Sequence, residues 1–347
     1  MSSTLSLTRL TRHHPGQQHP ALADMNLEVP AGSCTAILGP SGSGKSTALR
    51  LIAGLDSPTS GSVALDGVDV TALPPERRGV GMVFQRPLLF PHMSVIDNVG
   101  FAARASGQSR SAARSSARRY LDLVHLSEFA DRRVGAISGG QAQRVALARS
   151  LAGAPRVLLL DEPFSALDSV LREDMYQLVR EIRDELSPTI VLVTHDRDEA
   201  AVLADSVAVL IDGVLEHHSD VGSAYTQPAT LAVNRLMGGI NEIHGRLDRG
   251  VHHSDLGALD LPPGRPAHDD GPAVLLIRHE MVRIVDRSPG LPSGVICGVR
   301  PTGLRCIADI RVGSVTVRAE LPTGATASVG VEVGLEIPLA ARTAVTR

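Results

Sequence analysis

One segment carries the pattern of a phosphate-binding loop. Residues 39–46 read Gly-Pro-Ser-Gly-Ser-Gly-Lys-Ser, which fits G-x-x-x-x-G-K-[ST], between a strand-like run and a helical pattern. Glycines let backbone N–H groups face phosphate oxygens, and the following helix adds its positive N-terminal end. The Lys45 ammonium suits the β- and γ-phosphates, and the Ser46 hydroxyl suits Mg²⁺. We therefore predict that ATP is bound by this P-loop, namely Gly39, Pro40, Ser41, Gly42, Ser43, Gly44, Lys45, Ser46 and Thr47.

The lysine of this pattern has no counterpart elsewhere in the sequence. Of the 34 Lys and Arg residues, Lys45 is the single lysine. Codon bias could leave one lysine anywhere, and a glycine turn between strand and helix is the structural alternative. Because the lysine falls at the position that the motif requires, we favour the nucleotide site.

Two acids end a second apolar run. Residues 156–162 read as a buried strand, which places Asp161 near a metal and Glu162 one residue further, facing the attacking water. Acids at strand ends are also common solvated caps, so the pair alone does not identify a site.

A third segment is a glycine loop before a helix. Ser138, Gly139, Gly140 and Gln141 precede the helical run 142–151, so their amides and the serine hydroxyl lie at a helix N-terminus. Such loops are frequent, and the signal is weak by itself. One chain nevertheless offers two phosphate-binding helix ends.

The elements around these residues alternate between strand and helix. Strand patterns at residues 33–38, 157–160, 190–193 and 207–210, with helical patterns between them, predict a parallel sheet with crossover helices. Between about residues 85 and 136 the strand signals fade, and residues 109–124 read as a helix. The fold class is therefore α/β, with a helical insertion.

The chain is long enough for two domains. It has 347 residues, and its composition shifts after about residue 238, with a linker or domain edge near residues 235–245. Hydrophobic residues alternate at 315–321 and 331–339, which predicts a small, mainly antiparallel β barrel or sandwich. We predict an ATP-binding domain at residues 1–238, with a helical subdomain at 86–137, and a β domain at 239–347.

Composition excludes several other classes of protein. The net charge of −3 gives no basic field for nucleic acid. No apolar run approaches the roughly 20 residues of a membrane span, and the polar start lacks a signal-peptide core, so we expect a cytosolic chain. Cys34, Cys297 and Cys306 lack metal-ligand spacing and read as reduced packing residues.

The order of these motifs resembles that of the ATP-binding-cassette (ABC) ATPases over roughly the first 235 residues. The resemblance adds Gln85 after Gly-Met-Val-Phe, Ser-Ala-Leu before Asp168, and His195 between Thr and Asp. It implies that Glu162 is the base, that His195 contacts the γ-phosphate, and that Gln85 contacts Mg²⁺ and the water. Ser46, Gln85 and Asp161 would hold the metal.

The resemblance also implies a dimer. In this family the signature, here residues 138–141, closes over the nucleotide of a second cassette, and Asp168 would bridge the two protomers. With one P-loop and one signature per chain, a homodimer with two composite sites is the simplest arrangement. Ile137 replaces the usual leucine before the signature. The family stacks an aromatic ring on adenine where this chain has His14, with His13 as the second candidate; a solvated loop histidine is the alternative.

Residues 78–98 resemble the importer branch that handles oxyanions, ferric iron, polyamines and sugars, and carries a C-terminal domain like an oligonucleotide/oligosaccharide-binding (OB) barrel. Arg278-His279-Glu280 resembles the Arg-Pro-Glu start of that domain, with His279 in place of proline. The resemblance implies two separate permease subunits, an external solute-binding protein, and a location on the cytoplasmic face of the membrane. We expect the permeases to contact residues 85–101, the docking segment, through Leu88, Leu89, Phe90, Met93 and Val95; internal packing of these side chains is the alternative.

Three other functions are alternatives to import. An ABC ATPase acting on ribosomes or DNA would usually carry two cassettes or long coiled-coil insertions, which this sequence lacks. A C-terminal domain that senses solute and regulates the ATPase could coexist with transport. An exporter would more often fuse the cassette to membrane spans. The solute itself stays open, because in this family the cassette does not touch it.

Overall fold

The computed structural model describes residues 2–263, 270–302, 305–322, 324 and 327–346. The chain divides into two compact units, Met1–Val221 and Gly222–Arg347. Composition places the boundary at residue 238, whereas α9 (Leu231–Leu236) and most of α8 (Val221–Thr226) lie in the second unit. Arg278 explains the difference, because its guanidinium donates to the carbonyls of Tyr225 (2.9 Å) and Met237 (3.2 Å).

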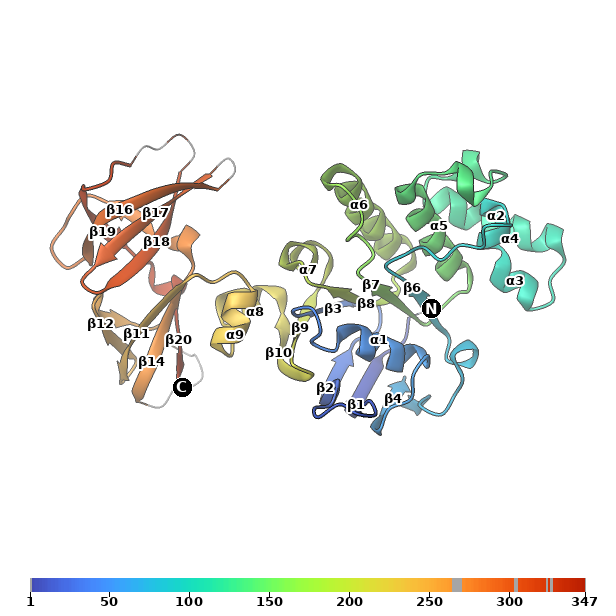
Figure 1. Ribbon diagram of the computed structural model, residues 1–347, viewed down its shortest axis with the longest axis horizontal. Coiled ribbons are helices and arrows are strands. Elements are labelled where there is room, and N and C mark those ends of the chain that lie inside the picture. The colour runs from blue at the N-terminus through green and yellow to red at the C-terminus, as the bar shows by residue number, and fades with distance from the viewer. Residues whose placement is uncertain (1, 264–269, 303–304, 323, 325–326, 347) are drawn as a thin grey trace. The chain divides into compact units, whose positions relative to one another are not determined.

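A six-stranded sheet forms the centre of unit 1, in the order β10-β9-β3-β8-β7-β6 (Figure 1). Five strands are parallel and β10 is antiparallel to β9. This arrangement confirms the predicted parallel α/β core. The strands are β3 (Cys34–Leu38), β6 (Val80–Val83), β7 (Val157–Asp161), β8 (Thr189–Thr194), β9 (Ser206–Ile211) and β10 (Val214–Asp220).

Alternate residues of the central strands enter different cores. Val157 and Leu159 of β7 pack in a cluster with α1 (Lys45–Ala53), while Leu158 and Leu160 pack in a cluster with the helices of the other face. Successive side chains of a strand point to opposite faces of the sheet. Both faces are therefore covered by apolar side chains, as a parallel sheet requires.

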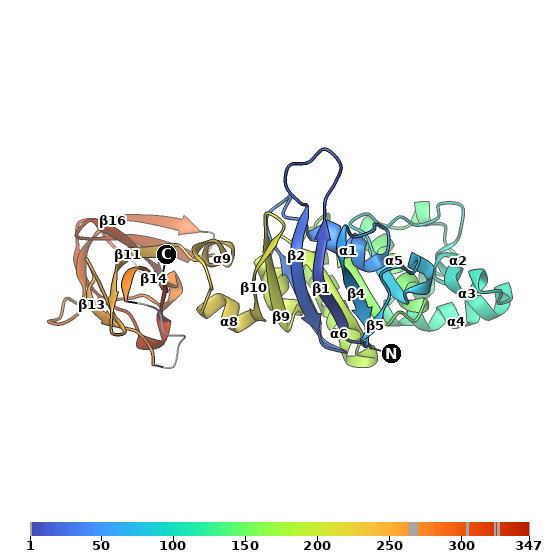
Figure 2. The ribbon, with the colours of Figure 1, turned by 90° about the horizontal axis from the view of Figure 1, so that it is seen from below.

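A second, antiparallel sheet covers α1 from the other side. Its order is β2-β1-β4-β5, and its side chains share one buried cluster with α1 and the central sheet, so α1 lies between two sheets (Figures 1 and 2). The sequence patterns above do not predict this sheet. Its strands are β1 (Leu5–Arg12), β2 (Leu22–Val29), β4 (Ser60–Leu65) and β5 (Val68–Asp69).

Helices fill the predicted insertion. They are α2 (Val95–Val99), α3 (Phe101–Ala105) and α4 (Arg110–Leu123), and α4 begins at the N-cap Ser109, whose hydroxyl accepts from the Ala112 amide. The helical prediction is confirmed. The remaining helices of unit 1 are α5 (Gly139–Ala152), α6 (Ser169–Leu186) and α7 (Arg197–Leu203).

Unit 2 contains two five-stranded antiparallel sheets with a common core. Their orders are β13-β12-β11-β14-β20 and β15-β19-β16-β17-β18, which confirms the antiparallel prediction. β19 is shorter than the alternation at 331–339, because Pro338 lacks an N–H and a 3₁₀ turn follows. The strands are β11 (Asn241–Asp248), β12 (Val251–Ser254), β13 (Gly257–Asp260), β14 (Gly271–Ile277), β15 (Arg283–Val285), β16 (Ser293–Thr302), β17 (Arg305–Val312), β18 (Val315–Leu321), β19 (Glu332–Glu336) and β20 (Arg342–Thr346).

Candidate nucleotide site

The predicted site residues follow the carboxyl ends of four neighbouring parallel strands. The P-loop follows β3, His195 follows β8, Asp161 ends β7, and Gln85 comes two residues after β6. The carboxyl ends of parallel strands meet at one edge of a sheet, which is where open α/β sheets bind ligands. The fold therefore assembles residues that are more than 100 positions apart in the sequence.

Glycine is needed at two P-loop positions because a Cβ there would clash with a backbone carbonyl oxygen. A Cβ on Gly39 would lie 2.1 Å from the Leu210 carbonyl oxygen. Gly44 has φ 100°, and a Cβ there would lie 2.2 Å from the Ala21 carbonyl oxygen. By contrast, nothing lies within 4 Å of a Cβ on Gly42, so the loop is open at its middle. Backbone packs behind the loop and leaves its outer side free for a ligand.

Lys45 reaches back into the loop. Its Nζ donates to the carbonyl oxygens of Gly39 and Pro40, both at 2.8 Å, and the residue is 5% exposed. Burial lowers the pKa of the ammonium, while Glu162 and Asp161 act in the opposite direction. The third N–H of the ammonium remains available to an oxygen of a ligand.

Ser46 and Asp161 meet at 3.0 Å between Oγ and Oδ1. Burial raises the pKa of the Asp161 carboxyl, and the adjacent Glu162 adds to the increase. Hydroxyl and carboxylate oxygens are the donors that Mg²⁺ prefers, and a cation here would offset the unfavourable burial of the charge. Among the described residues, Ser43 Oγ is also buried without a hydrogen-bond partner. This donor set fits a nucleotide with its magnesium ion.

Glu162 has an unusual backbone conformation. Its φ is 44°, in the left-handed region, and its N–H donates to the Val193 carbonyl at 3.0 Å. One carboxylate oxygen lies 3.4 Å from His195 Nδ1. Strain of this kind persists where surrounding contacts fix it, and it occurs often at functional sites. The turn at Glu162 directs its carboxylate toward His195, which follows β8.

Gln85 is linked to Glu162 through Ser165. Gln85 Nε2 donates to Ser165 Oγ at 3.0 Å, and Ser165 Oγ donates to the Glu162 carbonyl, also at 3.0 Å. A role for Ser165 could not be predicted, because a single serine in a loop carries no signal of what it will bond. Ser165 thus connects the Gln85 side chain to the Glu162 backbone.

The signature residues cap their own helix. Ser138 and Gln141 form a capping box at the start of α5, with each side chain accepting the other's backbone N–H. Asp168 caps α6 by a single carboxylate oxygen, which accepts from the backbone N–H groups of Val170 (3.1 Å) and Leu171 (2.9 Å). Gly139 is exposed, and a Cβ there would meet nothing within 4 Å. The chain itself therefore leaves open space at the signature.

A cavity of about 780 Å³ lies beside the P-loop. His14 is not among the described residues that line it; it is half-buried in the β1–β2 loop, where its carbonyl accepts from Gln17. Adenine stacking on His14 stays a prediction. The sequence does not predict this cavity, because its lining joins the β1–β2 loop to a turn that is distant in the sequence. The lining residues are Gln17, Gln18, His19, Pro20, Ala21, Ala23, Gly42, Asp212, Gly213 and Val214.

Comparison with known proteins agrees with this geometry. A family model described as ABC transporter matches residues 22–165. The sulfate/thiosulfate import ATP-binding protein CysA of Escherichia coli K12 is 42% identical over 271 residues, which cover 77% of this chain and 74% of that protein. The chain belongs to the ABC transporter family. The CysA protein of Mycobacterium tuberculosis is 46% identical over 229 residues, and the chain spans 65% of its length.

Solved structures show the same ABC cassette fold. The dimeric ATP-binding cassette MJ0796 bound to ADP and Pi is 34% identical, with a TM-score of 0.57, covering 62% of this chain and 98% of that one. The cbiO1 protein of Clostridium perfringens, part of an ABC transporter complex, is 29% identical, with a TM-score of 0.58, covering 64% and 90%. These matches establish the cassette fold, a P-loop nucleotide-binding fold with a helical subdomain.

In the described part of this ABC protein, no helix has the length and apolar character needed to cross a bilayer.

Proposed function

We propose that the chain hydrolyses ATP as a dimer and thereby powers import of a small oxyanion, sulfate or thiosulfate, through separate permease subunits. The convergence of Lys45, Ser46, Asp161 and Glu162 at one sheet edge carries the proposal. The CysA relatives are named as sulfate/thiosulfate import ATP-binding proteins, which supports import and the solute class. Ferric iron, polyamine and molybdate become the less favoured solutes, and action on ribosomes or DNA is not favoured.

The phosphates would bind to the backbone N–H groups of the P-loop and to the third donor of Lys45. Ser46, Asp161 and Gln85 would hold Mg²⁺, which neutralises phosphate charge when it is bound. Residues lining the 780 Å³ cavity would surround the ribose and base. Glutamine and histidine side chains there offer donors and acceptors in place of the stacking ring that the family usually supplies.

Glu162 would accept the proton of the attacking water, because its carboxylate is positioned at the strand end beside the magnesium donors. His195, 3.4 Å from that carboxylate, would orient it and contact the γ-phosphate. Ser165 would fix the position of the Gln85 side chain relative to the Glu162 backbone through its two 3.0 Å hydrogen bonds. The protein's contribution is thus positioning and proton transfer.

The open space at Gly139 suits a second copy of the chain. Backbone N–H groups at the start of α5 would close over the nucleotide held by the P-loop of that copy. Asp168 would contact the partner with the carboxylate oxygen that does not cap α6. Two composite sites would result, each incomplete in a single chain.

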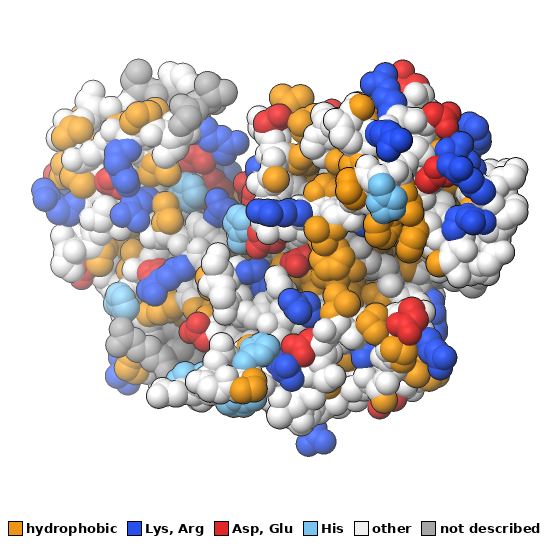
Figure 3. All heavy atoms as spheres, turned by 45° about the vertical axis from the view of Figure 1, so that its right-hand side comes forward, with side chains coloured by type: hydrophobic (Ala, Val, Ile, Leu, Met, Phe, Trp, Pro, Cys, Tyr) orange, Lys and Arg blue, Asp and Glu red, His pale blue; other side chains and the backbone are white. Residues whose placement is uncertain are grey.

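The docking segment and neighbouring helices form an apolar groove of about 330 Å³. Figure 3, which turns this side of unit 1 toward the viewer, shows hydrophobic side chains gathered there. Leu88 is 59% exposed and Phe101 is 38% exposed, whereas Val95 is fully buried in the core, so the predicted permease contact through Val95 is wrong. We propose that the permeases bind here, on the cytoplasmic face of the membrane, with an external solute-binding protein delivering the anion. The groove is lined by His92, Met93, Ile96, Asp97, Gly100, Phe101, Arg104, Arg110, Ala113 and Arg114.

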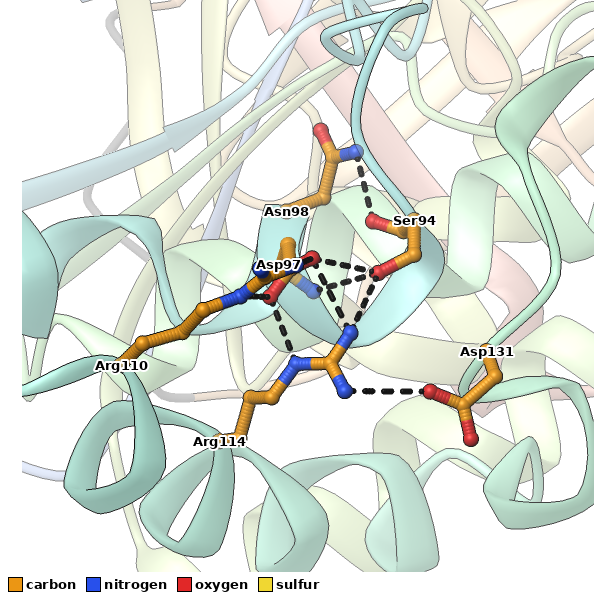
Figure 4. A network of polar contacts seen from close by, with 6 residues as sticks. All are labelled: Ser94, Asp97, Asn98, Arg110, Arg114 and Asp131. Carbon is orange, nitrogen blue, oxygen red and sulfur yellow. Dashed lines mark hydrogen bonds and ion pairs between the residues drawn. The ribbon is translucent and has the colours of Figure 1, made fainter.

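An ion-pair network holds the wall of this groove (Figure 4). Asp97 of α2 accepts from Arg114 Nε at 2.7 Å and from Arg110 Nη2 at 2.7 Å, both on α4. These arginines, Arg114 first, hold the pKa of the Asp97 carboxyl well below its usual range. Asp97 therefore links α2 to α4 through two arginines at the wall of the groove.

Glu162→Gln tests the proposal. We expect ATPase activity to fall by roughly 100-fold or more, since the amide cannot accept the proton, and we expect the variant to form a dimer only when ATP is added. Glu173→Gln, an exposed change on α6, is the matched control. Wild-type hydrolysis by Glu162→Gln would refute the mechanism. Uptake of radiolabelled sulfate by cells lacking the gene, with and without the restored chain, tests the solute.

A further inference from the structure

Arg149, a residue of α5, has an unusual set of partners. Its guanidinium donates to two backbone carbonyls of the docking segment, Leu88 (3.0 Å) and Pro87 (3.2 Å), and lies 5.6 Å from the centre of the Phe90 ring. Among the described residues no carboxylate pairs with it. Burial lowers its pKa, so the positive charge is held there at a cost. Arg149 is half-buried, and a cation that donates to neutral carbonyls in such a position fixes backbone geometry.

The backbone that Arg149 holds is itself strained. Leu88 has φ 44°, which a leucine rarely adopts. Its carbonyl accepts one of the two guanidinium bonds, and the Phe90 amide donates to Asn98 Oδ1 at 2.8 Å. Arg149 therefore maintains the conformation that leaves the Leu88 side chain exposed.

A second side chain of α5 binds the residue that directly precedes the docking segment. Gln143 Nε2 donates to the Phe84 carbonyl at 3.2 Å. Gln85 thus lies between two attachments to one helix, Phe84 on one side and Pro87 with Leu88 on the other. A displacement of α5 would carry Gln85 with it.

The same helix begins at the signature. Arg149 lies 11 residues after Ser138, which is roughly 16 Å along the helix axis. A helix of this length moves as a stiff body, so its first turn and Arg149 shift together. We propose that Arg149 is a positioning residue that transmits nucleotide-driven movement of the signature to Gln85 and the docking segment. This inference rests on the proposed ATP-dependent closure of the signature over a second copy.

Hydrogen exchange of the full-length chain tests the inference in the Glu162→Gln background, which retains ATP. With Arg149 present, we expect ATP to slow exchange of the amides of residues 86–90 by roughly tenfold. With Arg149→Met, ATP should still slow exchange in the P-loop but leave residues 86–90 unchanged. A merely structural role would raise exchange at 86–90 equally with and without ATP.

Controls separate the possible outcomes. Arg119→Met, an exposed change on α4, should behave like the parent protein. If Arg149→Met does not fold, Arg149→Lys tests the inference instead. Its single ammonium replaces the two-pronged guanidinium contact, so ATP should slow exchange at residues 86–90 to an intermediate degree. Full ATP-dependent slowing at 86–90 without Arg149 overturns the inference, as does absence of slowing in the parent while the P-loop is protected. Absence of P-loop protection would instead contradict the proposed nucleotide binding.

Discussion

Replacing Lys45 with arginine keeps the charge and changes its shape, and we expect this to abolish most activity. The Lys45 ammonium lies between the Gly39 and Pro40 carbonyls at 2.8 Å each, and the residue is 5% exposed. A guanidinium spreads five N–H donors over a plane. The Gly39 and Pro40 carbonyls and one phosphate oxygen can accept only three of these five hydrogen bonds. The remaining donors would lose water without gaining partners.

The size of the effect follows from these contacts. A hydrogen bond to a charged group contributes about 1.5–3 kcal/mol, and an unsatisfied buried donor costs about 1–3 kcal/mol. Losing one such bond to the phosphates would weaken ATP binding by about 1.5–3 kcal/mol, a rise in Kd of roughly 10- to 150-fold. We expect ATPase activity to fall by at least the same factor.

Titration with a fluorescent ATP analogue, in buffer with and without Mg²⁺, measures this Kd. Arg77→Lys is the matched control, because it makes the reverse change at an exposed position of the same unit and should leave the Kd unaltered. A Kd for Lys45→Arg close to that of the parent chain would refute the geometric reasoning.

Two further predictions concern stability. The folded-state pKa of Asp161 is raised, so its carboxyl contributes stability only while protonated, and this contribution is lost as the pH rises through that pKa. Asp161→Asn should therefore raise the melting temperature of the nucleotide-free chain at pH 7, with a gain that disappears near pH 4, although ATPase activity is lost; a gain independent of pH would contradict this. Arg78 is 3% exposed and donates to the carbonyls of Leu51, Ile52, Thr71 and Leu73, so Arg78→Met should cost about 3 kcal/mol or more in urea unfolding followed by circular dichroism. A loss below about 1 kcal/mol would show that water or rearrangement satisfies those carbonyls.

Features with short-range causes could be predicted from the sequence. The β3, P-loop and α1 succession follows from one eight-residue motif, and the start of α5 at Ser138 follows from cap chemistry. The central strands were found because both of their faces are buried, which gives continuous apolar runs.

The N-terminal antiparallel sheet escaped prediction for a local reason. Arg9 (φ 46°) and Asp24 (φ 48°) have left-handed conformations, and the pairing of β1 with β2 shifts register next to each of them. An irregularity in the pairing inserts or displaces a residue, which breaks the alternation on which strand prediction depends. Leu5, Leu7 and Leu10 therefore do not show a period of two.

Contacts between distant segments could not be predicted at all. Ser165 accepts a hydrogen bond from the Gln85 side chain, 80 positions away, and Arg149 donates to the Leu88 backbone carbonyl, 61 positions away. A serine or an arginine on a helix or loop carries no mark of such a partner. The site acids differ, because their position after an apolar strand and the edge rule of parallel sheets together indicate where they meet.

Because Lys45 is the only lysine in the sequence, its chemical modification can report whether the nucleotide site is occupied. Because no other side chain carries an amine, a lysine-directed acylating reagent has one internal target, and that target lies at the bottom of the phosphate loop. Mass spectrometry of a single peptide would then read nucleotide occupancy directly, without a probe attached elsewhere. In a chain rich in lysine the same measurement would be lost among dozens of surface modifications.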